Sequence, residues 1–110
     1  MPKPLKPTLR ERNRYIVFEV ISDSKPDRKS VVDAVWGSLL RLHGELGASR
    51  TSMWVMDYDP EKKRGILKVN HSSVDVLKSS MAVVKEIRRQ KAIINTVKTS
   101  GTLRKAREIL

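Results

Sequence analysis

The sequence contains no cysteine, and its aromatic residues are limited to two Trp, two Tyr and one Phe among 110 residues. Without cysteine the chain has no disulfide framework, no thiolate zinc site and no thiol nucleophile. No apolar run approaches the ~20 residues that a membrane-spanning helix needs, and no apolar signal segment lies near the N-terminus. These absences favour one cytoplasmic domain with a modest hydrophobic core and no membrane contact.

Motifs for catalysis are also absent. The two histidines, His43 and His71, have no partner at metal-ligand spacing, and no Gly-x-Ser-x-Gly, G-x-G-x-x-G or P-loop pattern occurs. Asp57 and Asp59 share one face of a predicted strand and could hold Mg²⁺ through their oxygens. A pair that enters the turn before Pro60 is the simpler interpretation. We therefore expect no catalytic residue, no metal site and no cofactor bound by this chain.

Positive charge is abundant and lies near both ends. The chain has 23 Lys+Arg against 12 Asp+Glu, a net charge of +11. Residues 1–14 carry five basic and one acidic side chain and residues 85–110 carry eight and two, whereas residues 15–84 are nearly neutral. A solvated charged face explains either end alone. Both ends together favour a nucleic acid partner, because counterion release rewards clustered cations, and neither end has the apolar aromatic face of a membrane-surface helix.

The pattern of apolar residues predicts six main elements and a short final helix. They are a strand at 15–21, a helix from Pro26 to Gly44 or Gly47 with Ser24 as its cap, strands at 51–58 and 66–70, a helix from Ser72 or Ser73 whose basic last turn holds Lys85, Arg88 and Arg89, a strand at 92–98 and a helix at 103–110. This order predicts an α+β, ferredoxin-like split βαβ fold: a four-stranded antiparallel sheet with a short extra C-terminal helix. Three prolines make residues 1–13 an extended basic arm before a single RNA-binding domain at 14–110.

The sheet has apolar residues on both of its faces. In the strands at 15–21 and 51–58 apolar side chains occupy successive positions, whereas a sheet with one wet face alternates apolar and polar residues. The terminal helix, a second copy or another subunit must cover the second face. Because the helix is short, we expect a protein partner at a surface that includes Tyr15, Val17, Trp54 and Met56.

Folds of this type often bind RNA through stacking aromatics on the first and third strands. The third-strand signature is K/R-G-F/Y-G/A-F-V-x-F/Y, and Arg64-Gly65 opens it correctly. Ile66, Lys68 and His71 then occupy the aromatic positions. We therefore expect recognition of folded RNA by shape and phosphate contacts in place of base stacking.

The segment Ser100-Gly101-Thr102 precedes the final helix, where free backbone N–H groups attract an anion. A phosphate contact and simple capping by Ser100 or Thr102 both remain open. Charge and position select the following RNA-binding candidates: Arg10, Arg12, Arg14, Lys63, Arg64, Lys68, Arg88, Arg89, Lys91, Lys98, Ser100, Gly101, Thr102, Arg104 and Lys105.

Five segments carry a resemblance to a known family. They are 7–16 (PTLRERNRYI), 42–49 (LHGELGAS), 54–59 (WVMDYD), 64–70 (RGILKVN) and 99–105 (TSGTLRK). In this order they resemble the archaeal ribonuclease P protein component 2 family, the counterpart of the eukaryotic ribonuclease P/MRP subunit Pop-five. The resemblance covers nearly the whole chain.

The resemblance implies a non-catalytic subunit of an endoribonuclease, a hydrolase that removes the 5′ leader from precursor tRNA. In that family the chemistry belongs to the RNA and its Mg²⁺ ions. The implied partners are ribonuclease P RNA, precursor tRNA in the assembled particle and ribonuclease P protein component 3. A homodimer and a heterotetramer both remain open.

Three other functions are compatible with parts of the sequence. A ribosomal or other ribonucleoprotein subunit of the same fold shares the charge argument. A small-molecule-sensing regulatory domain shares the fold but gives no reason for the basic ends. A stand-alone nuclease would use Asp57 and Asp59, and cleavage by RNA-free protein would identify it.

Overall fold

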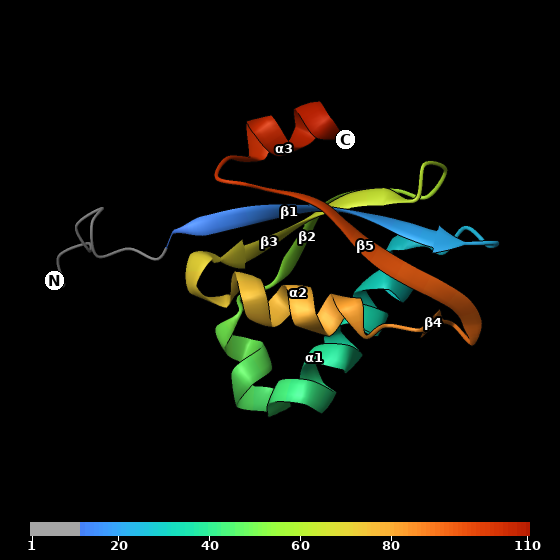
Figure 1. Cartoon of the computed structure of the whole chain (residues 1–110), viewed down its shortest axis with the longest axis horizontal. Coiled ribbons are helices and arrows are strands. Elements are labelled where there is room, and N and C mark those ends of the chain that lie inside the picture. The colour runs from blue at the N-terminus through green and yellow to red at the C-terminus, as the bar shows by residue number, and fades with distance from the viewer. Residues whose placement is uncertain (1–11) are drawn as a thin grey trace, which may run out of the picture.

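A five-stranded antiparallel sheet organises the part of the chain that the structure, a computed structural model, describes: residues 12–110. The strands are β1 (Asn13–Ser22), β2 (Trp54–Asp59), β3 (Arg64–Asn70), β4 (Glu86–Ile87) and β5 (Gln90–Ser100), in the spatial order β2-β3-β1-β5-β4. Helices α1 (Arg28–Arg50) and α2 (Val74–Ala82), preceded by the 3₁₀ turn η2 (His71–Ser73), lie on one face. Helix α3 (Leu103–Ile109) lies on the other face (Figure 1). The α+β class and the antiparallel sheet are confirmed.

The main core lies between the sheet and helices α1 and α2. Alternate residues of β1 point into it, because successive strand side chains face opposite sides. Its members include Ile16, Phe18, Val20, Val31, Val35, Leu39, Leu67, Leu77 and Met81, each at most 4% exposed. Burial of each large side chain stabilises the fold by about 1.5–3 kcal/mol, so this layer fixes the position of the sheet.

A second, smaller core lies under α3. Val17 of β1, Ile66 of β3 and Ala106 of α3 are all 0% exposed. The expectation that both faces of the sheet are apolar is therefore confirmed. The expectation that α3 is too short to cover the second face is wrong for the half that contains Val17 and Ile66. In the other half Ile21 and Ile93, which pair across β1 and β5, remain 54% and 52% exposed.

The predicted four-stranded sheet and the long second helix both need correction. Helix α2 ends at Ala82, and a short connection leads into the two-residue strand β4, which is the fifth strand of the sheet. Val84 and Ile87 continue the three- and four-residue spacing of the helix, and both are buried. Val84 reaches the core from the connection after α2 and Ile87 reaches it from β4, and the spacing alone does not distinguish this path from a further helical turn. The predicted basic helix end is therefore a hairpin.

Helix α1 also begins and ends differently from the prediction. Asp27, and not Ser24, is its N-cap, since the Asp27 carboxylate accepts the Ser30 N–H at 3.0 Å. Gly44, with φ of +72°, interrupts the helix, but helical structure resumes and continues to Arg50.

The predicted basic arm at 1–13 lies mostly outside the described residues. Asn13, which was assigned to the arm, already belongs to β1, where it pairs with Asn70. Within residues 12–110 no helix is long and apolar enough to cross a membrane.

Candidate RNA interface

The predicted RNA-binding residues separate to opposite ends of the sheet. At one end Tyr15 of β1 lies between Lys68 of β3 and Ser100 of β5. At the other end Ser22 pairs with Ala92, next to the β4–β5 turn. Strand β5 connects the two ends, and its ten residue steps of about 3.3 Å span about 33 Å. One phosphate therefore cannot contact both ends.

We name the two sets by their position. The α3-end group contains Arg12, Arg14, Lys68, Lys98, Ser100, Gly101, Thr102, Arg104 and Lys105. The hairpin-end group contains Lys63, Arg64, Arg88, Arg89 and Lys91. Arg10 lies outside the described residues.

The α3-end group includes cations on α3 and on strands β1, β3 and β5. Arg104 and Lys105 are exposed, and neither forms an ion pair within residues 12–110. A hollow of about 470 Å³ between β5 and α3 is lined by Lys98, Lys105 and Glu108, among others. Two of these three charged groups are cationic, so the hollow favours an anionic ligand.

Side chains already use part of the backbone at the start of α3. Thr102 is the N-cap, and its Oγ1 accepts the Lys105 N–H at 3.2 Å. The Ser100 hydroxyl oxygen accepts the Thr102 N–H at 3.2 Å and donates to the Thr102 carbonyl at 3.0 Å. The capping role considered for Thr102 is therefore present, whereas the phosphate contact stays a prediction.

The hairpin-end group divides into residues held by the fold and residues that extend into solvent. Lys63 Nζ donates to the Ser22 carbonyl at 2.5 Å, and Arg64 Nε lies 3.8 Å from a Glu19 carboxylate oxygen. Arg89 and Lys91 are exposed and form no ion pair with any described residue. The exposed members are therefore the better candidates for an external partner.

Helix α3 closes the centre of the sheet face on which related folds stack bases. Ile66, which occupies an aromatic position of the RNA-binding signature, is completely buried under α3. Lys68 lies in register between Tyr15 and Trp54, and only Trp54, at the β2 edge, is largely exposed at 64%. This geometry leaves little of that face open for base stacking.

The predicted protein-partner surface is mostly covered. Val17 is fully buried, and Tyr15 and Met56 pack partly buried beside it under α3. Trp54 alone stays accessible, beside a hollow of about 300 Å³ that Trp36 also lines. The spacing of apolar residues assigns Trp36 to the apolar stripe of α1, and its side chain is partly buried against the main core.

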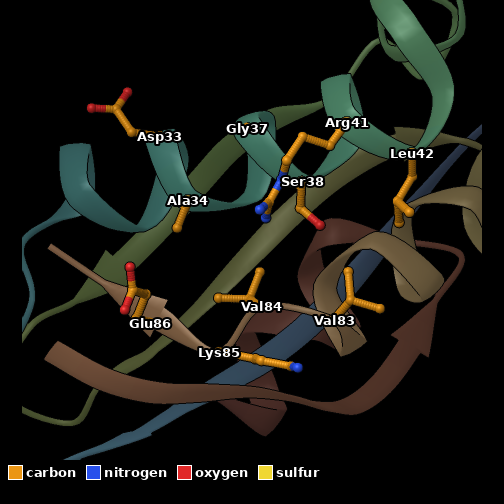
Figure 2. Close-up of a pocket in the computed structure, with 10 residues that line it drawn as sticks. All are labelled: Asp33, Ala34, Gly37, Ser38, Arg41, Leu42, Val83, Val84, Lys85 and Glu86. Atoms are coloured by element: carbon orange, nitrogen blue, oxygen red, sulfur yellow. The ribbon is translucent and has the colours of Figure 1, made fainter. Parts of the chain in front are cut away.

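A further groove lies away from the predicted RNA-binding residues. It has a volume of about 730 Å³ and runs between α1 and the segment that joins α2 to β4. Figure 2 shows Ala34, Ser38 and Val84 along it, with the Arg41 side chain directed back over Ser38. The Ser38 hydroxyl donates to the Ser80 carbonyl at 2.6 Å, so this hydroxyl has a structural role that joins α1 to α2. The groove contains none of the predicted RNA-binding residues and no nucleophile paired with a base.

The two aspartates considered for Mg²⁺ also have structural partners. Asp57 Oδ2 accepts the Arg107 Nε–H at 2.8 Å, which raises the pKa of Arg107. Asp59 Oδ1 accepts the Glu61 N–H at 3.0 Å in the β2–β3 turn. Within residues 12–110 no three His, Cys, Asp or Glu side chains form a group suited to a metal ion.

Comparisons with known proteins agree with the family resemblance. The model of the Rpp14/Pop5 family matches residues 14–110. Ribonuclease P protein component 2 of Pyrococcus abyssi is 36% identical over 106 residues, with 96% of this chain and 90% of the relative covered. Its namesake in Methanococcus maripaludis is 36% identical over 108 residues, with 98% and 82% covered.

The fold matches a solved structure as well. A chain in the cryo-EM structure of yeast ribonuclease MRP aligns with a TM-score of 0.71 at 18% identity, covering 89% of this chain and 79% of that one. The likeness supports the arrangement of sheet and helices. Together with the match along residues 14–110, the sequence similarity shows that the chain belongs to the Rpp14/Pop5 family.

Proposed function

We propose that the chain is a non-catalytic protein subunit of ribonuclease P that supports the catalytic RNA in removing the 5′ leader of precursor tRNA. The relatives named ribonuclease P protein component 2 support this function. The observation that carries the mechanism is that α3 buries Ile66 while Arg104 and Lys105 on the same helix stay exposed. The face that could stack bases is closed, and cations lie on the helix that closes it.

The proposed mechanism is electrostatic. Exposed Lys and Arg side chains neutralise phosphates where RNA helices pack closely, which stabilises the active RNA fold and lowers the Mg²⁺ that it requires. The two basic groups lie at opposite ends of β5, about 33 Å apart, so they would contact separate RNA segments. No proton transfer by this chain enters the mechanism.

The proposal includes a ferredoxin-like core. Without β4 and α3, the order of elements along the chain is βαββαβ and the order of strands in the sheet is β2-β3-β1-β5, as expected for that fold.

The proposal also includes a protein partner. The family resemblance makes ribonuclease P protein component 3 the proposed partner. Exposed apolar side chains give such a partner surface to bury, among them Leu42, Leu46 and Val83 at 50%, 67% and 44% exposure.

Reconstituted cleavage tests the function. Ribonuclease P RNA is incubated with precursor tRNA over a range of Mg²⁺ concentrations, with and without the chain. We expect no cleavage by the chain alone and a lower Mg²⁺ requirement when it joins the RNA. Cleavage by the RNA-free chain, or an unchanged Mg²⁺ requirement, would contradict the proposal.

A charge variant makes the test specific to α3. Arg104→Ala/Lys105→Ala should raise the Mg²⁺ requirement of the reconstituted particle. The matched control, Arg50→Ala/Lys78→Ala, removes two charges from α1 and α2 and should leave the requirement unchanged. If the chain binds the RNA tightly but particles with Arg104→Ala/Lys105→Ala require no more Mg²⁺ than particles with the wild-type chain, a structural ribonucleoprotein role replaces the α3 mechanism.

A further inference from the structure

A two-residue turn joins β4 to β5, and both of its residues are arginines. Ile87 pairs with Gln90 across the hairpin, so Arg88 and Arg89 are the central residues of the turn. Their φ angles are +51° and +64°, both in the left-handed region. Two positive φ angles in a two-residue hairpin are the signature of a type I′ turn, which Asn-Gly fills with the least strain.

The fold gains little from arginine at these positions. A residue with a Cβ destabilises the chain when it is held in the left-handed region. Arg89 forms no ion pair with the described residues, and Arg88 lies 3.6 Å from Asp27 Oδ2 with both side chains more than half exposed. Asp27 already caps α1 by accepting the Ser30 N–H, so it does not depend on Arg88. Backbone strain at Arg88 and Arg89 that no packing contact offsets indicates that the two side chains serve a function outside the fold.

The charges on and beside the turn are mainly positive and favour an anionic ligand. Lys85 and Lys91 flank the two arginines, and Glu86 is the one acidic residue between positions 85 and 91. Ile87, the apolar residue next to the turn, is only 3% exposed and offers a protein partner little surface. A guanidinium group presents a planar fork of donors that matches the oxygens of a phosphate. The surface therefore suits a polyanion with repeated phosphates.

We propose that the Arg88–Arg89 turn binds the phosphate backbone of the RNA, as a contact separate from the α3-end group. The inference rests on the proposed function, because that function supplies the RNA. In Figure 1 the β4–β5 hairpin lies at the opposite end of the molecule from the start of α3. The turn fixes the backbone of both arginines before binding, so less backbone entropy is lost when their side chains meet phosphates.

The test separates the strain of the turn from its charge. Arg88→Asn/Arg89→Gly installs the preferred residues of a type I′ turn and removes both charges. We expect its melting temperature to rise by about 4–8 °C. We expect its affinity for ribonuclease P RNA to fall about tenfold, and the slope of log affinity against log salt to become shallower by about two units, one for each lost phosphate contact.

Two further variants complete the test. Arg50→Ala/Lys78→Ala removes the same charge from α1 and α2 and should keep the wild-type salt slope. Arg88→Lys/Arg89→Lys keeps charge and strain but loses the planar fork, so it should keep the wild-type slope and bind more weakly. These results, with the higher melting temperature of the Asn-Gly variant, support the proposal.

Other results overturn it in distinguishable ways. If wild-type chain binds the RNA and the Asn-Gly variant binds equally well, this inference fails while the proposed function stands. If that variant binds RNA normally but fails to join a partner protein, the turn belongs to a protein interface. If wild-type chain shows no affinity for the RNA, both the function and this contact fail.

Discussion

Arg107 of α3 donates its Nε–H to Asp57 of β2 across 2.8 Å, which ties the last helix to the edge of the sheet. The hydrogen bond to Asp57 is the largest cause of the raised pKa of Arg107. The pair lies beside the small core of Val17, Ile66 and Ala106. Through this pair and this core, a helix of seven residues stays on the sheet while Arg104 and Lys105 remain exposed.

Arg107→Ala should therefore loosen α3. Alanine is a strong helix former, so the substitution removes the contact with Asp57 without a loss of helix propensity. We expect faster amide hydrogen exchange in α3 and little change in the main core under α1 and α2. Arg104→Ala, on the same helix and without an ion pair in the described structure, serves as the control. Equal protection of α3 in the Arg107 variant and the wild type would argue against the role of this pair.

Gly65→Ala should destabilise the protein by overpacking. A Cβ at this position would lie 2.7 Å from the Asp57 carbonyl oxygen and 2.7 Å from Phe18 Cζ. The β2 bulge between Val55 and Asp57 and the buried Phe18 ring fix both neighbours. Overpacking of this kind lowers the free energy of unfolding by about 1–3 kcal/mol, measurable by urea denaturation.

Gly37→Ala provides the contrast. A Cβ there has no atom within 4 Å, and the position lies in α1, where alanine is favoured by about 0.5–1 kcal/mol. We expect a higher free energy of unfolding for this variant. A Gly65 variant as stable as the wild type would show that β2 and β3 separate more easily than the structure indicates.

Tyr58 should make stability depend on alkaline pH. Burial first, and then the negative charges of Asp27 and Asp59, raise the pKa of Tyr58 above its ordinary value of 10.0. The neutral phenol is therefore favoured in the folded state. Its contribution to stability is fully present below pH 10 and is lost as the pH rises through the raised pKa.

Tyr58→Phe tests this dependence. The variant loses the hydrogen bond from the phenol to the Pro26 carbonyl at 2.7 Å, which should lower stability by about 1 kcal/mol at neutral pH. Its free energy of unfolding should then fall less than that of the wild type between pH 9 and 12, since the variant lacks the Tyr58 phenol, whose raised pKa returns to its ordinary value on unfolding. Parallel curves for the two proteins in urea denaturation would contradict the assignment.

The apolar pattern predicted most of the fold for identifiable reasons. Alternate residues of β1, such as Ile16 and Val17, lie in different cores, and the sequence showed apolar residues on both faces. The same pattern could not separate α2 from β4, because Val84 and Ile87 keep a helical spacing and are buried although both lie beyond the end of α2. The β4–β5 turn was missed because its residues are arginines in place of Asn-Gly.

The candidate site could be predicted as a list of residues but not as a geometry. Terminal charge selected Arg89 and Lys105, which are both exposed. That they lie at opposite ends of β5 depends on the strand order of the sheet, which residue spacing does not specify. The burial of Ile66 by α3 likewise depends on a tertiary contact with Ala106.

Salt dependence tests the central claim most directly. The affinity of the chain for ribonuclease P RNA is measured at several salt concentrations. If about six phosphates are contacted, the slope of log affinity against log salt should lie near −4 to −5. An affinity that does not change with salt, or no association at low ionic strength, would contradict the account of this chain as a basic support for RNA.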